Sequence, residues 1–204
     1  MQKKIRILCI GDSHTAGFPS FDPLYGGNIK SSYEYWLDLL LKQKYKTIKF
    51  IIENKGQCGE TSFEVYRRFK ALLSKNMYNL SIFWAGANDI ALGYSTAEIW
   101  ANLLKASKIA QNKDIKFIII NIPPMNWPSL NLIIKDLNER ISSYKKNVYL
   151  CANVHNVLEE KGKLKADYDA GDGVHLSQKG YQEVGKAIFK IILPLIDNIV
   201  NSEL

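Results

Sequence analysis

The sequence predicts an α/β protein built in three layers around a parallel β-sheet. Short apolar runs, which are typical of strands, alternate along the chain with stretches of helical periodicity. Strands that alternate with helices imply right-handed parallel crossovers, so helices are expected on the faces of one sheet. With 204 residues the chain is long enough for one domain with a proper core, and we expect a single domain over 1–204.

The first strand is the apolar run of residues 5–10, which Gly11 and Asp12 end abruptly. This pattern predicts a buried strand followed by a tight turn. Ser13 carries the first polar group after the turn, at the carboxyl end of the strand, where open α/β sheets bind ligands. The alternative is that Ser13 only caps the next helix.

A long segment rich in Pro, Gly and aromatic residues follows over 18–28. It is either a surface connection or a wall of the substrate groove, and the sequence favours neither. The next helix is expected to begin at Ser31 or Ser32 and to face the core with every third or fourth residue. A second strand is predicted over 47–53.

The middle of the chain repeats this alternation. Thr61 or Ser62 is expected to cap a helix that leads to a third strand over 81–85. The next helix is expected to open at Ser95 or Thr96.

The fourth strand, predicted over 115–122, is nearly all apolar, as expected for a strand buried on both faces. Pro residues end it, and an irregular loop follows over 125–129, then a helix around 130–144 and a fifth strand at 148–150. The final helix is expected to face the core with a stripe of apolar residues: Tyr181, Val184, Ile188, Ile191, Ile192 and Leu195.

The formal net charge is +7, but no block of Lys and Arg is longer than two residues. A nucleic-acid reader is expected to concentrate its basic residues in a patch, so we expect no nucleic-acid partner. No metal-ligand cluster, Walker loop or dinucleotide fingerprint occurs in the sequence, and no cofactor is expected.

The three cysteines, Cys9, Cys58 and Cys151, have no spacing that indicates a disulfide framework. We interpret them as free thiols in a reducing compartment and predict a cytoplasmic protein. The apolar run near the N-terminus is too short for a signal peptide and contains Arg6, and no segment is long enough to span a membrane.

A serine hydroxyl needs a base to become a nucleophile, and histidine is the usual base near neutral pH. His175 follows Asp172 by three residues, so the carboxylate can orient the imidazole while its other nitrogen faces Ser13. This is the logic of a catalytic triad in the chain order Ser, Asp, His. The alternative roles are a turn aspartate and a solvated loop histidine.

Other residues of the same types lie nearby. Asp167 and Asp169 could compete for the orienting role, although their spacing to His175 is less favourable. His14 is expected to be a pocket or surface residue, and His155 to begin a short helix without a catalytic role.

Four short motifs occur in order along nearly the whole chain: Gly11-Asp12-Ser13, Cys58-Gly59-Glu60-Thr61-Ser62, Gly86-Ala87-Asn88-Asp89 and Asp172-Gly173-Val174-His175. Together they resemble the SGNH hydrolase superfamily, also called the GDSL esterases and lipases. The resemblance implies a flavodoxin-like, doubly wound sheet of about five strands in the order 2-1-3-4-5. In that order Ser13 lies at the topological switch point of the sheet.

The resemblance also implies an oxyanion hole, which would be formed by the backbone N–H groups of Ser13 and Gly59 and the side-chain amide of Asn88. Gly56 is a rival for the loop glycine. Cys58 stands where the family often has Ser, and we interpret it as a small loop residue.

The expected activity is the hydrolysis of small-molecule carboxylic esters, with short acyl groups, through an acyl-enzyme on Ser13 with His175 as the base. The walls of the groove are expected to include Phe21, Tyr25, Met125 and Trp127. A thioesterase or lysophospholipase, a carbohydrate deacetylase and an acyltransferase could use the same site. The non-enzymatic alternative is a binding module that kept the fold.

Overall fold

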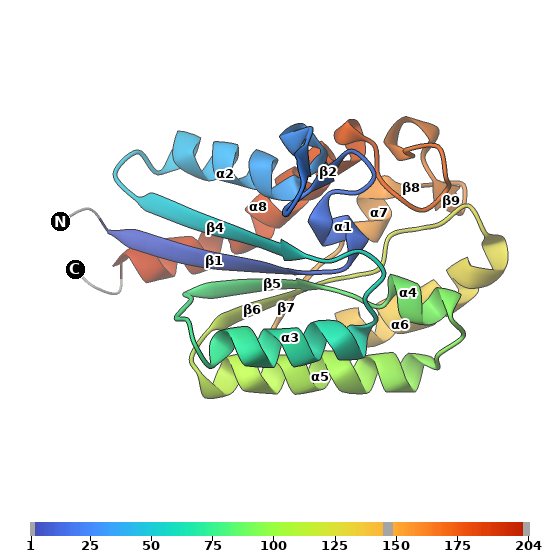
Figure 1. Ribbon diagram of the computed structural model, residues 1–204, viewed down its shortest axis with the longest axis horizontal. Coiled ribbons are helices and arrows are strands. Elements are labelled where there is room, and N and C mark those ends of the chain that lie inside the picture. The colour runs from blue at the N-terminus through green and yellow to red at the C-terminus, as the bar shows by residue number, and fades with distance from the viewer. Residues whose placement is uncertain (1–2, 145–148, 202–204) are drawn as a thin grey trace.

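A five-stranded parallel sheet forms the centre of the molecule (Figure 1). The computed structural model describes residues 3–144 and 149–201. The spatial order of the strands is β4-β1-β5-β6-β7, which is the order 2-1-3-4-5 of the sequence-based prediction. The strands are β1 (Lys4–Gly11), β4 (Lys49–Gly56), β5 (Leu80–Trp84), β6 (Lys116–Ile120) and β7 (Leu150–Ala152).

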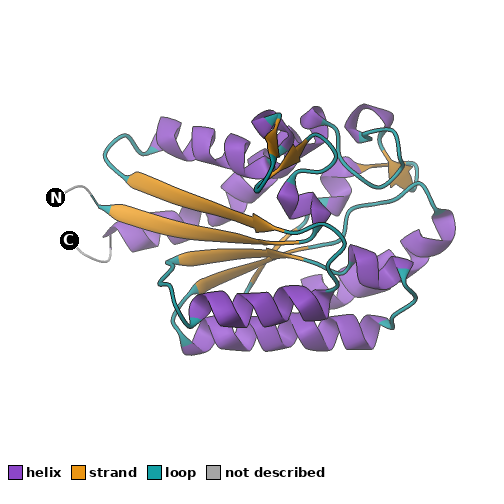
Figure 2. Cartoon of the chain, viewed as in Figure 1, coloured by secondary structure: helices purple, strands orange, loops and turns teal. Residues whose placement is uncertain are grey.

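Helices cover both faces of this sheet and complete the three layers (Figure 2). Two of them, α2 (Tyr33–Lys44) and α8 (Gln178–Asn201), pack against each other on one face. The opposite face is covered by α3 (Ser62–Leu73), α5 (Thr96–Asn112) and α6 (Pro128–Ser143). The predicted fold class is therefore confirmed.

The alternation of side chains in β1 explains why its residues from Ile7 to Ile10 are all apolar. Ile7 and Cys9 point into the core beneath α2 and α8, whereas Leu8 and Ile10 point into the core beneath α3 and α5. A central strand between two helical layers buries both of its faces, so its fully buried part favours apolar residues on both of them.

The helices begin where capping residues were predicted. Thr61 and Glu64 form a reciprocal capping box at the start of α3, and Ser95 and Glu98 form another at the start of α5. Ser32 is the N-cap of α2.

Several smaller elements gather at the carboxyl ends of the strands. The helices among them are α1 (Ser13–Ala16), α4 (Ala87–Ala91) and α7 (His155–Leu158). Two short hairpins lie between them, made by β2 (Phe21–Asp22) with β3 (Gly26–Gly27) and by β8 (Glu159–Glu160) with β9 (Lys163–Leu164). Two 3-10 turns complete the set, at Ile29–Ser31 and Ala166–Tyr168.

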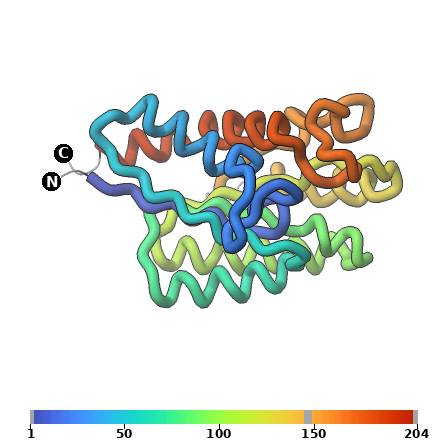
Figure 3. Tube along the Cα trace, turned by 45° about the horizontal axis from the view of Figure 1, so that its top comes forward, coloured from blue at the N-terminus to red at the C-terminus, as the bar shows by residue number. Residues whose placement is uncertain are grey.

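The segment 18–28 contacts the beginning of α8, as the tube in Figure 3 allows the reader to follow. The Tyr181 hydroxyl donates to the Phe18 carbonyl over 2.8 Å, and the Asn28 amide donates to the Gln178 side chain over 3.1 Å. The sequence indicated an irregular connection here. The structure instead forms the β2–β3 hairpin and a 3-10 turn, because Gly26 and Gly27 adopt positive φ angles that allow the tight reversal.

Several predicted boundaries differ from the structure. The second strand continues to Gly56, which remains paired with Gly11 of β1. Helix α6 begins at Pro128, inside the predicted loop, because proline is well suited to the first turn of a helix. The last strand is Leu150–Ala152 rather than 148–150, and Val148 lies outside the described residues.

Candidate active site

The turn between β1 and α1 presents Ser13 at the carboxyl edge of the sheet. Gly11 is required there, because a Cβ at this position would lie 2.2 Å from the Trp84 carbonyl oxygen. Asp12 caps α1 by accepting the backbone N–H of His14 over 3.0 Å. Ser13 is therefore the first residue of a short helix and is itself only 6% exposed.

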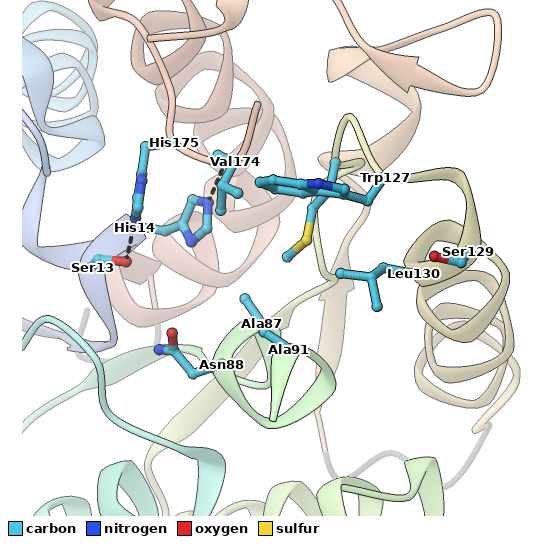
Figure 4. A pocket seen from close by; sticks show the side chains of 11 residues that line it. Ser13, His14, Ala87, Asn88, Ala91, Trp127, Ser129, Leu130, Val174 and His175 are labelled. Carbon is cyan, nitrogen blue, oxygen red and sulfur yellow. Dashed lines mark hydrogen bonds between the residues drawn. The ribbon is translucent and has the colours of Figure 1, made fainter. Parts of the chain in front are cut away.

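Ser13, His175 and Asp172 form one hydrogen-bonded chain. The Ser13 Oγ lies 2.9 Å from the Nε2 of His175, and the Nδ1 of His175 lies 2.6 Å from the Oδ2 of Asp172 (Figure 4 draws the contact with Ser13). A carboxylate only accepts, so Nδ1 carries the proton and Nε2 is free to accept the hydroxyl proton of Ser13. The backbone N–H groups of Val174 and His175 donate to Asp172 Oδ1 over 2.9 and 2.8 Å and fix the carboxylate.

The electrostatics keep the aspartate charged and the histidine neutral. Partial burial would raise the pKa of Asp172, but hydrogen bonds from the backbone and ring of His175 and from the Val174 N–H lower it to about 2. The pKa of His175 is lowered, first by burial and then by the nearby His14, against the opposing effect of Asp172. At neutral pH His175 is therefore in the form that accepts a proton.

Ser13 and His175 open into a pocket of about 520 Å³ that leads away from them toward α6 (Figure 4). This volume lies in the usual range for small-molecule sites, about 300–1,000 Å³. Most of the wall is apolar, and no Asp, Glu, Lys or Arg side chain of the described residues lines it. Besides Ser13, His14 and His175, the lining residues are Ala87, Asn88, Ala91, Met125, Trp127, Ser129, Leu130 and Val174.

Of the four predicted wall residues, two line this pocket and two do not. Met125 and Trp127 line it, the first buried and the second 46% exposed. Phe21 instead lines a separate pocket beside α2 and β4, and Tyr25 is 90% exposed at the hairpin tip. Both residues belong to the β2–β3 hairpin and neither lines the pocket beside Ser13, so the expectation that they form its wall requires correction.

Three contributions to the site were missed in the sequence. Phe18 packs the edge of its ring against the ring of His175, with centroids 4.6 Å apart. Ala87 and Ala91 line the pocket from α4, a helix that follows the predicted strand 81–85 and was not itself predicted. Their spacing of four residues places them on the same helix face, and this was the signal available.

The predicted oxyanion-hole residues come from three different turns. Asn88 lines the pocket on α4, and its amide donates to the Glu60 carbonyl over 2.9 Å. One of its two amide protons is used in this bond, which leaves the second for a ligand. Gly59 is exposed in the turn after β4 with a φ of +81°, in the left-handed region.

The turns that carry Asn88 and Gly59 are tied together by Asp89. Its carboxylate accepts the backbone N–H of Ser62 over 2.7 Å and the Ser62 hydroxyl over 2.6 Å. Burial raises the pKa of Asp89, while the hydrogen bonds from Ser62 oppose that effect. The link holds the start of α4 against the start of α3.

The rival acids have other partners. Asp169 accepts the backbone N–H of Gly173 over 3.0 Å and the Asn126 amide over 2.8 Å, so it braces the loop that holds His175. Asp167 pairs with Lys179 over 2.5 Å on the surface. The structure thus brings Asp172, and neither rival, to His175.

The remaining candidate residues lie outside the hydrogen-bonded chain of Ser13, His175 and Asp172. His155 begins α7 and makes a 3.0 Å contact with the Ile122 carbonyl. A Cβ on Gly56 would lie 2.0 Å from the Ala16 nitrogen, so this glycine is needed for close packing. Cys58 is an exposed free thiol. Within residues 3–144 and 149–201, no group of three or more His, Cys, Asp and Glu side chains could hold a metal ion.

Comparison with known families agrees with this geometry. A family model described as the GDSL-like Lipase/Acylhydrolase family matches residues 9–183, which is most of the chain. The protein is an ester-cleaving hydrolase, and it belongs to the GDSL-like lipase/acylhydrolase family. The resemblance inferred from the four sequence motifs is confirmed. No curated protein sequence matches the chain.

Several solved structures share the fold at low sequence identity. A lipolytic protein of the G-D-S-L family from Veillonella parvula superposes with a TM-score of 0.77 at 19% identity, covering 92% of this chain and 97% of that one. A family 3 carbohydrate esterase from Clostridium thermocellum gives 0.74 at 18%, covering 97% and 99%. The esterase EstA from Pseudoalteromonas sp., in a structure inhibited by monoethylphosphonate, gives 0.71 at 22%, covering 95% and 99%.

None of the helices in the described part of the chain has the length and apolar character needed to cross a membrane.

Proposed function

We propose that this protein hydrolyses carboxylic esters through an acyl-enzyme on Ser13, with His175 as the general base and Asp172 as its orienting acid. The observation that carries this proposal is the continuous hydrogen-bonded chain from Ser13 through His175 to Asp172, at one end of an apolar pocket. Membership of an acylhydrolase family supports it.

In the first step the Ser13 oxygen attacks the ester carbonyl carbon while its proton moves to Nε2 of His175. The carbonyl electrons move onto oxygen. When the carbonyl re-forms, the bond to the alcohol oxygen breaks, and the leaving alkoxide takes the proton from His175. Asp172, with its pKa held to about 2, stays ionised and stabilises the imidazolium formed between these events.

The negative charge on the carbonyl oxygen needs donors that are already in place. We propose the backbone N–H groups of Ser13 and Gly59 and the free amide proton of Asn88. The N–H of Ser13 opens α1, so it is not used within that helix. The Glu60 carbonyl holds the Asn88 amide in one orientation before substrate arrives.

Hydrolysis of the acyl-enzyme reverses these roles. His175 takes a proton from water, the hydroxide oxygen bonds to the acyl carbon, and Ser13 leaves with the proton that His175 returns. Every group in these reaction steps belongs to the chain, to the ester or to water, so the proposal needs no cofactor.

We propose that the pocket holds the acyl chain and accepts short to medium lengths, up to about eight carbons, an estimate that rests on an apolar wall rewarding each buried CH₂. The sequence analysis expects short acyl groups. Apolar walls from α4 and the start of α6, such as Ala91 and Leu130, support extending that range to medium lengths.

Thioesters, lysophospholipids and acetylated sugars are alternative substrates for the same site, and acyl transfer to an alcohol is an alternative outcome. The apolar lining favours an acyl chain over a sugar in the pocket. A cytoplasmic location stays a prediction, supported by three unpaired cysteines.

Labelling with a fluorophosphonate tests the proposal, because an activated serine attacks this reagent readily. The wild-type protein should be modified on Ser13, and Ser13→Ala should abolish the label. Ser129→Ala is the matched control, since Ser129 lines the same pocket without a bond to His175, and its variant should label normally. Labelling of another residue, or an active Ser13→Ala variant that hydrolyses nitrophenyl esters, would contradict the proposal. The absence of any label on the folded wild-type protein would also contradict the proposal and would favour the non-enzymatic alternative.

A further inference from the structure

The residue after the nucleophile is an unusual one for a buried position. His14 is 1% exposed, and its ring lies beside that of His175 (Figure 4). Its Nε2 lies 3.1 Å from the carbonyl oxygen of Val174, the residue before His175, and its Nδ1 lies 3.4 Å from Oδ1 of Asp12. The family motif named G-D-S-L has leucine at this position, so the imidazole is a departure of this chain.

The surroundings of His14 decide where its protons lie. A carbonyl oxygen only accepts, so Nε2 must carry a proton to bond Val174. In the neutral ring of His14, Nδ1 would then be an acceptor that faces the carboxylate of Asp12. Within the described residues, neither His14 Nδ1 nor Asp12 Oδ2 has a hydrogen-bond partner. A second proton on Nδ1 turns this repulsion into an ion pair. Burial alone lowers the pKa of His14, but Asp12, the Val174 carbonyl and Asp172 together raise it.

The two imidazoles are close enough to influence each other. The ring centroids of His14 and His175 are 5.4 Å apart at 32°, and the centroid of the Trp84 ring lies 5.1 Å from that of His14. The charged or titratable groups that act on His14 are Asp12 on its own turn and Asp172 and His175 on the opposite loop. A positive charge on His14 disfavours a second one on His175.

We propose that His14 is a positioning residue for the reaction proposed above. Its Nε2–H holds the Val174 carbonyl, and with it the loop of Asp172 and His175, against the turn that carries Ser13. Its imidazolium, paired with Asp12, keeps His175 unprotonated. The inference rests on the proposed function, because it assigns His14 a task only if His175 is the base for Ser13.

Two substitutions separate the hydrogen bond from the charge. His14→Leu removes both, whereas the amide of His14→Gln can still donate to Val174 but carries no charge. We expect His14→Leu to lower kcat about tenfold or more for every acyl length with KM nearly unchanged, since small displacements of a catalytic group are costly. We expect His14→Gln to recover most of kcat at pH 8, but to move the acid limb of kcat/KM upward by about one pH unit.

The contrary outcomes are distinct. Wild-type kcat and an unmoved acid limb in both variants would overturn the inference. A change confined to KM or to the acyl-length profile would make His14 a wall of the pocket and would equally overturn it. The melting temperature of each variant shows whether it folds.

Nitrogen-15 NMR of the histidine rings in the wild-type protein keeps the inference testable if both variants unfold. The His155→Gln variant assigns the signals of His155, which lies outside the site, and the Ser13→Ala variant identifies those of His175. At pH 6 we expect two protonated ring nitrogens on His14, and a single one would overturn the inference. If the wild-type protein takes no fluorophosphonate label, the proposed function fails while the state of His14 is still measured.

Discussion

Filling the outer part of the pocket should shorten the acyl chains that the enzyme prefers. Ala91 lies on the pocket wall at the end of α4, and its side chain is solvent-exposed at the surface of the helix. Ala91→Leu adds a branched alkyl group to this wall and leaves Ser13 and His175 untouched. The substitution should therefore obstruct a long acyl chain and admit a short one.

The size of the effect follows from burial. Octanoyl exceeds butyryl by four CH₂ groups, and full burial of each contributes about 0.8 kcal/mol, or about 3 kcal/mol in total. The pocket is open to solvent on one side, so we take half of that value. About 1.5 kcal/mol corresponds to a wild-type preference of about tenfold in kcat/KM for octanoyl over butyryl. Ala91→Leu should bring this ratio close to one.

Hydrolysis of nitrophenyl butyrate and octanoate below their aggregation limits measures this ratio directly. Ala101→Leu is the matched control, because Ala101 is exposed on α5 away from the pocket lining, and it should keep the wild-type ratio. An Ala91→Leu enzyme with an unchanged ratio and normal activity would refute the assignment of this pocket to the acyl chain. A wild-type enzyme that prefers acetyl esters would refute the estimate of its depth.

Three further predictions concern the site and its support. Asn88→Ala should lower kcat by about 10²–10³ with little change in KM, in steady-state kinetics, because its amide acts on charge that develops only near the transition state. Asp172→Asn should lower kcat severely, whereas its matched control Asp169→Asn should not. A severe loss of kcat in Asp169→Asn but not in Asp172→Asn would make Asp169 the acid that orients His175. Burial raises the pKa of Glu34 to about 8, so the folded protein holds a proton that the unfolded chain releases above about pH 4.5, and stability falls as pH rises between these values. Glu34→Gln should remove this loss of stability, so the melting temperature of the variant minus that of the wild type should be larger at pH 8 than at pH 5. An equal difference at the two pH values would contradict the prediction.

The fold was readable from the sequence where a single physical rule decides the structure. The apolar stretch of β1 from Ile7 to Ile10 follows from burial on both faces. The caps at Thr61 and Ser95 follow from the need of helix N-termini for acceptors. The order of the strands came from the family resemblance, because composition and periodicity do not state which strands are neighbours.

The chemical core of the site was also readable, because it depends on residue types at close spacing. Asp172 and His175 are three residues apart, so the local turn alone brings them together. Contacts between distant segments were not readable. The placement of Phe18 against His175 depends on how the turn after α1 and the hairpin fold, and the direction of Phe21 and Tyr25 depends on the same hairpin.

The environment of His14 could not be predicted from the sequence either. The side chains of Ser13 and His14 diverge, since Ser13 contacts the His175 ring while His14 reaches the Val174 carbonyl. Whether such a histidine is exposed or buried depends on what packs above it, and here the loop of His175 covers it. Only the tertiary structure reveals that both residues meet the same loop.

The central claim is that Ser13 carries the acyl group during turnover. Rapid mixing of the enzyme with nitrophenyl octanoate, acid quench within the first turnover, and mass spectrometry of the peptides measure this directly. We predict an octanoyl group on the peptide that contains Ser13, which appears with the first equivalent of nitrophenol and disappears as the substrate is exhausted. An acyl group on a different residue, such as Cys58, would contradict the account. Nitrophenol release with no acylated peptide, either in the wild-type enzyme or in the slowed Asp172→Asn variant, would contradict it as well.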